Sequence, residues 1–149
     1  MKTTRDAATR TALFHRIQML DANAVAKWGK MDVKQMLHHC ILWEEMALGR
    51  IKTKRSFMGR IFGRFVLRNI LKDDTRLTRN TPTSPEIKID VVPSTDFSSQ
   101  KQHWIAVIEE NAVNTDTGFT HPFFGKLTRD QVCQMSYKHT DHHLRQFNG

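Results

Sequence analysis

The sequence predicts an all-α fold, a four-helix bundle with an additional basic helix and a long irregular connection. Several stretches repeat their apolar residues at helical spacing, and two of them begin with a capping-box pattern. Only residues 86–92 alternate as a strand would, and one strand without a partner does not form a sheet. Amphipathic helices without a sheet bury their apolar faces against one another, which favours a bundle.

The size and composition predict one soluble domain, residues 1–149. A chain of 149 residues with 39% hydrophobic and 26% charged residues is typical of a folded protein. No apolar run approaches the roughly 20 residues that cross a bilayer, and the first residues are too polar for a secretory signal. We therefore expect no transmembrane segment, a cytoplasmic location, and free thiols at Cys40 and Cys133.

The first two helices are expected at residues 7–20 and 32–49. Apolar residues of the first recur at helical spacing, and turn-forming residues follow it. The second begins at Asp32, whose carboxylate can accept from first-turn amides, with Gln35 three residues on as in a capping box. It should end near Gly49.

The basic helix is expected at residues 56–71. Residues 50–72 hold eight basic and no acidic residues, so this segment accounts for the whole net charge of +8. Two sides of the helix differ in character, one basic and one apolar: Arg60, Arg64, Arg68 and Lys72, against Phe57, Ile61, Phe65 and Val66. We expect the apolar side to cover the core. The helix is also compatible with an anionic membrane, with phosphates or with an acidic substrate, but no nucleic acid is expected because no recognition motif accompanies the charge.

An irregular connection is expected at residues 73–95, where three prolines and many turn formers occur. Within it, residues 86–92 could form a short extended piece. The fourth helix, 96–112, should bury four residues: Phe97, Trp104, Val107 and Ile108. The last helix, 128–147, begins with the second capping-box pattern, Thr128 and Gln131.

Two histidines of the last helix, His139 and His143, are four residues apart and so lie one turn above the other. They continue a stripe that begins with apolar residues and should face inward. A buried imidazole without a partner costs about 1–3 kcal/mol, so an inward pair needs a specific partner such as a metal ion. A structural histidine pair and an exposed polar helix end are the alternatives.

A third ligand is available on the second helix, where His38 and His39 are adjacent. We favour His39, because apolar residues share its side, whereas charged and polar residues flank His38. His142 lies at the edge of the inward stripe and is an alternative ligand, an outer partner of the site or an exposed neighbour. Three imidazoles would leave a coordination position open for water or substrate, the catalytic rather than the structural pattern.

The expected chemistry is not that of the H-E-x-x-H metalloproteases, because Thr140 stands where their glutamate base would be. A metal ion can still lower the pKa of a bound thiol or water. Cys40 adjoins His39 but points about 100° away around the helix, so we interpret it as a core residue. No catalytic residue is assigned by the sequence.

Three stretches resemble known proteins: "KHTDHHLRQF" (138–147), "HPFFGKLT" (121–128) and "WGKMDVKQMLHHC" (28–40). The first resembles the H-x-x-H-H-x-x-Q pattern of the DinB-like superfamily, which includes bacillithiol- and mycothiol-dependent S-transferases. The others are similar to a bacterial branch known only as a domain of unknown function. The resemblance implies a four-helix bundle, often a homodimer, in which three histidines hold zinc, nickel or a similar divalent ion.

Carried onto this chain, the resemblance implies His39, His139 and His143 as the ligands. Gln146 matches the final polar position of the pattern and is expected at the site or in a helix-end hydrogen bond. His121, in the loop before the last helix, is expected to pack that loop, with the mouth of the site as its alternative place.

Two classes of function remain open. The first is a metal-dependent enzyme acting on a small molecule, with a low-molecular-weight thiol transferred to an electrophile as its reaction and a hydrolase as a further option. The second is a non-enzymatic stress-response or binding bundle, whose histidine site is structural or vestigial and whose basic helix contacts an anionic partner.

Overall fold

The computed structural model describes residues 1–81, 83–89, 96–116 and 119–149, and these are mostly helical. They contain five α-helices, one 3-10 turn and two short strands. The elements are α1 (Ala7–Gln18), α2 (Val33–Ala47), α3 (Phe57–Ile70), η1 (Pro85–Ile87), α4 (Phe97–Val113), β1 (Thr120–His121), β2 (Gly125–Lys126) and α5 (Arg129–Gln146). Each helix expected from the sequence is present, with its ends within two residues of the prediction.

Helices α2 and α5 begin with the capping boxes that the sequence predicts. The Asp32 carboxylate accepts from the Gln35 backbone N–H at 2.8 Å, and the Gln35 side-chain oxygen accepts from the Asp32 N–H at 2.9 Å. Thr128 and Gln131 make the same reciprocal pair. These bonds satisfy backbone donors that a helix start leaves open, so they fix where each site-bearing helix begins.

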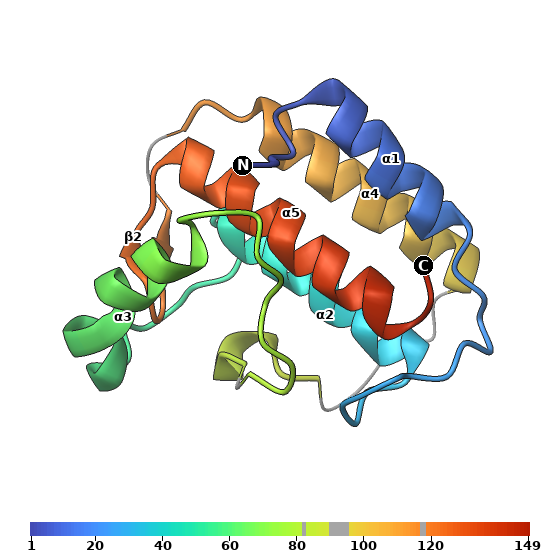
Figure 1. The fold of residues 1–149 in the computed structure, drawn as a ribbon, viewed down its shortest axis with the longest axis horizontal. Helices are drawn as coiled ribbons and strands as arrows, with labels where there is room; N and C mark the ends of the chain where they lie inside the picture. The colour runs from blue at the N-terminus through green and yellow to red at the C-terminus, as the bar shows by residue number, and fades with distance from the viewer. Residues whose placement is uncertain (82, 90–95, 117–118) are drawn as a thin grey trace.

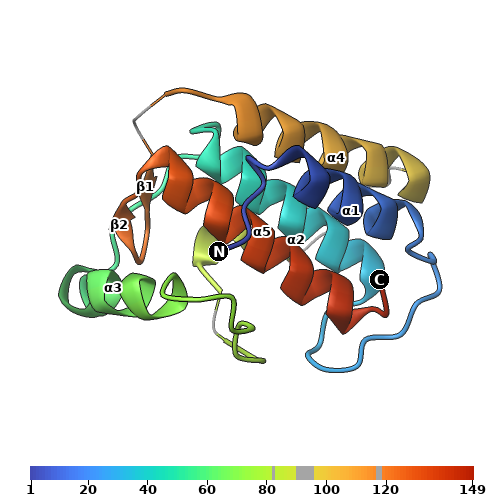
Figure 2. The same cartoon turned by 45° about the horizontal axis from the view of Figure 1, so that its top comes forward.

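Four of the helices, α1, α2, α4 and α5, lie against one another, whereas α3 stands to one side beside the short β1–β2 hairpin (Figures 1 and 2). Fully buried apolar side chains fill the space between the four helices, among them Leu13, Ile17, Met36, Leu37, Trp104, Ile108 and Leu144. A second cluster continues the core toward η1 and the hairpin. The core thus holds α2 and α5 side by side, which positions the histidines that they carry.

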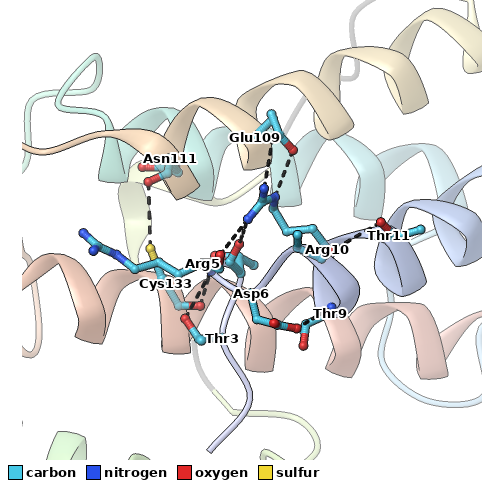
Figure 3. A network of polar contacts seen from close by, with 11 residues as sticks. Thr3, Arg5, Asp6, Thr9, Arg10, Thr11, Glu109, Asn111 and Cys133 are labelled. Atoms are coloured by element: carbon cyan, nitrogen blue, oxygen red, sulfur yellow. Dashed lines mark hydrogen bonds and ion pairs between the residues drawn. The ribbon is translucent and has the colours of Figure 1, made fainter.

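The N-terminal segment is tied across α4 and α5. Arg10 forms an ion pair with Glu109 at 3.0 Å and also donates to the Arg5 carbonyl (Figure 3). The Thr4 N–H donates to the Cys133 carbonyl at 3.2 Å. Cys133 and Cys40 are buried free thiols, which confirms that expectation.

The packing of α3 corrects the sequence prediction. Gly59, Gly63 and Leu67 are the buried residues of this helix, whereas Phe57, Ile61 and Phe65 are 74%, 56% and 75% exposed and Val66 is half-buried. A Cβ atom at Gly63 would lie 2.0 Å from the Phe123 carbonyl oxygen. The hairpin backbone therefore lies so close to α3 that only the glycine side of the helix fits against it. The hydrophobic pattern of the sequence does not indicate such a close approach.

The expected extended piece at residues 86–92 is also corrected. Its first two residues belong to η1, which buries Ile87, and residues 90–92 lie outside the described part of the chain. The two strands that do form are two residues long and pair antiparallel, Thr120 with Lys126 and His121 with Gly125. None of the described helices has the length and apolar character needed to span a membrane.

Candidate metal centre

The structure brings His39 of α2 together with His139 and His143 of α5. One ring nitrogen from each of these side chains lies within 4.8 Å of the other two. The Nε2 atoms of His39 and His139 are 3.1 Å apart, and the ring centroids of all three pairs are between 4.6 and 5.0 Å. We call these three residues the histidine cluster.

The His39 ring is oriented by the backbone of η1. Its Nδ1 lies 2.9 Å from the Ile87 carbonyl oxygen, and because a carbonyl only accepts, Nδ1 carries the proton. In the neutral ring Nε2 then has a free lone pair, and this atom faces His139. A carbonyl or carboxylate on the outer nitrogen of a histidine is the usual outer partner of a metal ligand.

The His143 ring is oriented in the same way by Gln146. Its Nδ1 lies 2.8 Å from the Gln146 side-chain oxygen, while the Gln146 amide nitrogen donates to the Trp28 carbonyl at 2.6 Å. The second bond fixes which end of the amide is oxygen, so His143 is again the donor at Nδ1. Gly29 has φ +83°, and a Cβ there would lie 2.7 Å from the Gln146 nitrogen. Glycine thus permits the close turn that holds this amide.

His139 is the member of the cluster that reaches the surface. It is partly exposed, whereas His39 and His143 are only 4% and 7% exposed. Its ring stacks on Trp43, with centroids 5.3 Å apart and an angle of 25° between the planes. One flank of the cluster is therefore closed by an indole.

All three imidazoles are held in the neutral form at neutral pH. Burial lowers the pKa of His143 to about 3, and the charge that a protonated His39 would carry lowers it further. Burial is also the main cause of the lowered pKa of His39 and of a pKa well below the usual value at His139, with neighbouring histidines adding to it. Neutral imidazole is the form that binds metal ions.

The spacing of the His39 and His139 donor atoms fits a small divalent ion. With Zn–N bonds of about 2.1 Å, two ligand nitrogens lie about 3.4 Å apart at a tetrahedral angle and about 3.0 Å apart at a right angle. The 3.1 Å between the Nε2 atoms of His39 and His139 falls between these values. Two lone pairs at this distance repel each other unless a cation or a proton lies between them.

The other histidines named from the sequence lie outside the cluster. The ring of His142 is half-buried between Trp28 and His143, with centroid distances of 5.5 and 5.1 Å. His38 is on a different side of α2, where the charge of Glu45 acts on it. His121 packs the hairpin: its Nδ1 accepts from two backbone N–H groups, and its ring stacks on Phe124.

A buried polar network beside the cluster was not predicted from the sequence. The Glu44 carboxylate on α2 is fully buried and accepts from the Ser136 hydroxyl and the Asn111 amide, both at 2.6 Å. Arg129, itself 8% exposed, donates to the Asn111 carbonyl at 2.8 Å and to its side-chain oxygen at 3.1 Å. Both Glu44 oxygens are thus engaged, so this carboxylate is not placed as a base for the histidine cluster. Glu44 lies four residues after buried Cys40 and so on the same side of α2. This spacing could have indicated that the carboxylate is buried.

The network makes stability depend on pH in a direction that can be tested. Burial raises the pKa of Glu44 to about 8, against the opposing effects of Ser136, Asn111 and Arg129. Between about pH 4.5 and 8 the folded chain then holds a proton that the unfolded chain releases, so stability should fall by up to about 1.4 kcal/mol per pH unit as pH rises. We expect Glu44→Gln to remove this fall between pH 6.5 and 8 in thermal melts. Equal slopes for the two proteins would contradict it.

The fold defines a helical protein, and its histidine cluster is compatible with metal binding. Residues 5–149 match the model of a family described as "Protein of unknown function (DUF1569)", and the chain belongs to that family. No curated protein and no solved structure matches the chain.

Proposed function

We propose that the protein binds a divalent metal ion, zinc or nickel, through His39, His139 and His143. One observation carries the proposal: the outer nitrogens of His39 and His143 are committed to fixed oxygen acceptors, which leaves the Nε2 lone pair of each neutral ring free for an ion shared with His139. Oxygen acceptors on the outer nitrogens are the usual partners of metal-ligating histidines. We further propose that the four packed helices form a bundle of the DinB-like type, with the cluster at its site.

The reaction that this site supports best is transfer of a low-molecular-weight thiol to a small electrophile. A divalent ion at the cluster would supply the positive charge that lowers the pKa of a thiol. The chain supplies orientation: Ile87 and Gln146 fix two rings, and Trp43 closes one flank. Partly exposed His139 marks the side on which a substrate would enter.

Metal analysis of the purified protein tests the proposal. We expect close to one zinc or nickel ion per chain, removed by a chelator and restored on dialysis against either metal. A chain that is isolated without metal and takes up neither ion would overturn the metal site. If the ion is present, a screen of several small thiols against an electrophile tests the transfer reaction. A chain that binds the metal but transfers no thiol would leave the hydrolase as the proposed enzyme.

Gln146 offers a test of the outer hydrogen bond. Gln146→Leu removes the acceptor for His143 Nδ1 and should weaken metal affinity about 10- to 100-fold. Gln146→Glu keeps an acceptor and should retain the affinity within a few fold, although it loses the bond to the Trp28 carbonyl. Isothermal titration with Zn²⁺ measures both. Equal losses in the two variants would show that the amide acts only through packing.

A second candidate function, a binding protein whose histidine cluster is structural, is favoured by the same 3.1 Å contact. Without an ion, the contact between the Nε2 atoms of His39 and His139 is a hydrogen bond if one of them carries a proton. Nitrogen NMR shifts of the imidazoles separate the two cases. A protonated His139 Nε2 that persists at saturating zinc would favour the structural role.

A further inference from the structure

The outward face of α3 carries a continuous apolar surface that nothing else in the described part of the chain covers. Five large side chains on it have exposed fractions from 47% to 75%: Phe57, Met58, Ile61, Phe62 and Phe65. At about 100° per residue, they share one side of the helix, almost opposite the packed side that Gly59 and Gly63 occupy. Scattered exposed apolar residues are ordinary, but a contiguous patch of this kind marks an interaction site.

The helix is held rigidly while it presents this face. Ser56 accepts from the Gly59 N–H at 3.0 Å, and Arg64 donates to the Lys126 carbonyl at 2.9 Å. Arg55 donates to the carbonyl groups of His121, Phe123 and Gly59 and so joins the start of α3 to the hairpin. Figures 1 and 2 both show α3 projecting beyond the four packed helices, where a flat partner can reach it.

The charges beside the apolar face indicate the partner. Arg60 and Arg64 are exposed and lie along one edge of the apolar surface, and Arg68 and Lys72 are exposed just beyond its C-terminal end. The segment 50–72 contains eight basic residues and no acidic ones. A helix with large apolar side chains on one side and arginines beside them is the arrangement that lies in the surface of an anionic bilayer, with the apolar side chains below the phosphates and the guanidinium groups among them.

The same charges disfavour a second copy of the chain as the occupant. In a two-fold dimer the patch would meet itself and bring the basic residues of two α3 helices into one interface. With no acidic residue in 50–72, the segment itself offers no neutralising partner for them.

We propose that α3 docks the protein on the surface of an anionic lipid bilayer by inserting the face formed by Phe57, Met58, Ile61, Phe62 and Phe65. The helix lies parallel to the surface and does not cross it. The inference is independent of the metal centre, because it rests on residues outside the histidine cluster.

Flotation of the full chain with lipid vesicles tests the proposal. We expect binding to phosphatidylcholine vesicles that also contain phosphatidylglycerol, little binding to phosphatidylcholine alone, and a decrease with added salt. Replacing Ile61 and Phe65 with serine should lower the partition coefficient by at least about tenfold for each side chain. Arg60→Gln with Arg68→Gln should lower it by about fivefold for each charge.

Matched controls remove exposed apolar side chains and exposed positive charges at other places on the surface. Val25→Ser with Val113→Ser removes apolar side chains that are 80% and 66% exposed, and Lys30→Gln with Lys34→Gln removes two exposed charges. Both should bind vesicles as the unaltered chain does. Absence of binding to anionic vesicles, or equal losses in the controls, would overturn the proposal. So would a concentration-dependent dimer, seen by analytical ultracentrifugation, that the Ile61 and Phe65 changes abolish while vesicle binding is unaffected.

Discussion

Alanine in place of His139 is expected to lower the affinity of the chain for Zn²⁺ by at least about a hundredfold, because two histidines rarely hold a divalent ion firmly. The His139 ring packs against Trp43 and against the other two histidines, so its removal also costs packing and the metal-free variant should melt below the metal-free parent. The response to zinc separates the two effects. An ion that binds only the folded chain raises its melting temperature, so zinc should stabilise the parent and not the variant.

Two neighbouring histidines provide matched controls for this change. His142→Ala alters a half-buried ring of the same helix, and His38→Ala alters the residue adjacent to His39. Both should keep their metal within a few fold of the parent, as measured by competition with a chromophoric chelator. The proposed ligand set would be rejected if His139→Ala retained full metal content, or if either control lost it.

Alanine in place of Gly63 is expected to detach α3 from the hairpin. A helical Gly→Ala change on its own stabilises by about 1 kcal/mol. Here, however, the new Cβ would lie 2.0 Å from the Phe123 carbonyl oxygen and 3.1 Å from the Phe124 Cα atom. Both neighbours are backbone, so the helix has to move, and overpacking of this kind costs about 1–3 kcal/mol. Hydrogen exchange of the α3 amides should become up to about a hundredfold faster.

The exchange measurement has an internal reference and a control variant. Amides of α2 and α5 should keep their protection in Gly63→Ala, because their contacts lie in the main core. Asn69→Ala places alanine at an exposed position of the same helix and should leave α3 as protected as in the parent. If the α3 amides of Gly63→Ala kept their protection from exchange, the close packing of α3 against the hairpin would not be what stabilises the helix.

The helices could be predicted from the sequence because their signals are local. Capping boxes at Asp32 and Thr128 lie within four residues, and apolar periodicity reports which side of each helix faces the core. Periodicity also favoured His39 over His38, and the structure places the His39 ring beside those of His139 and His143. That these rings bind a metal stays a prediction.

The remaining features depend on contacts between segments far apart in the sequence. The acceptor of His39 is the backbone carbonyl of Ile87, 48 residues away, and backbone groups in a loop leave no sequence signal. The face of α3 was predicted wrongly because apolar side chains were assigned to the core, whereas the fit to the hairpin selects glycine. Glu44 was missed because buried carboxylates are rare, and its partners Ser136 and Asn111 come from two other helices.

The contact between His39 and His139 joins residues 100 positions apart, one on α2 and one on α5. An ion bound by both would act as a reversible cross-link that closes a loop over most of the chain. A disulfide that closes a loop of about 100 residues is worth about 4–5 kcal/mol in the chain-entropy account, and the two reduced cysteines provide no such bond. Metal supply would then govern not only chemistry at the site but also how long each copy of the protein survives proteolysis.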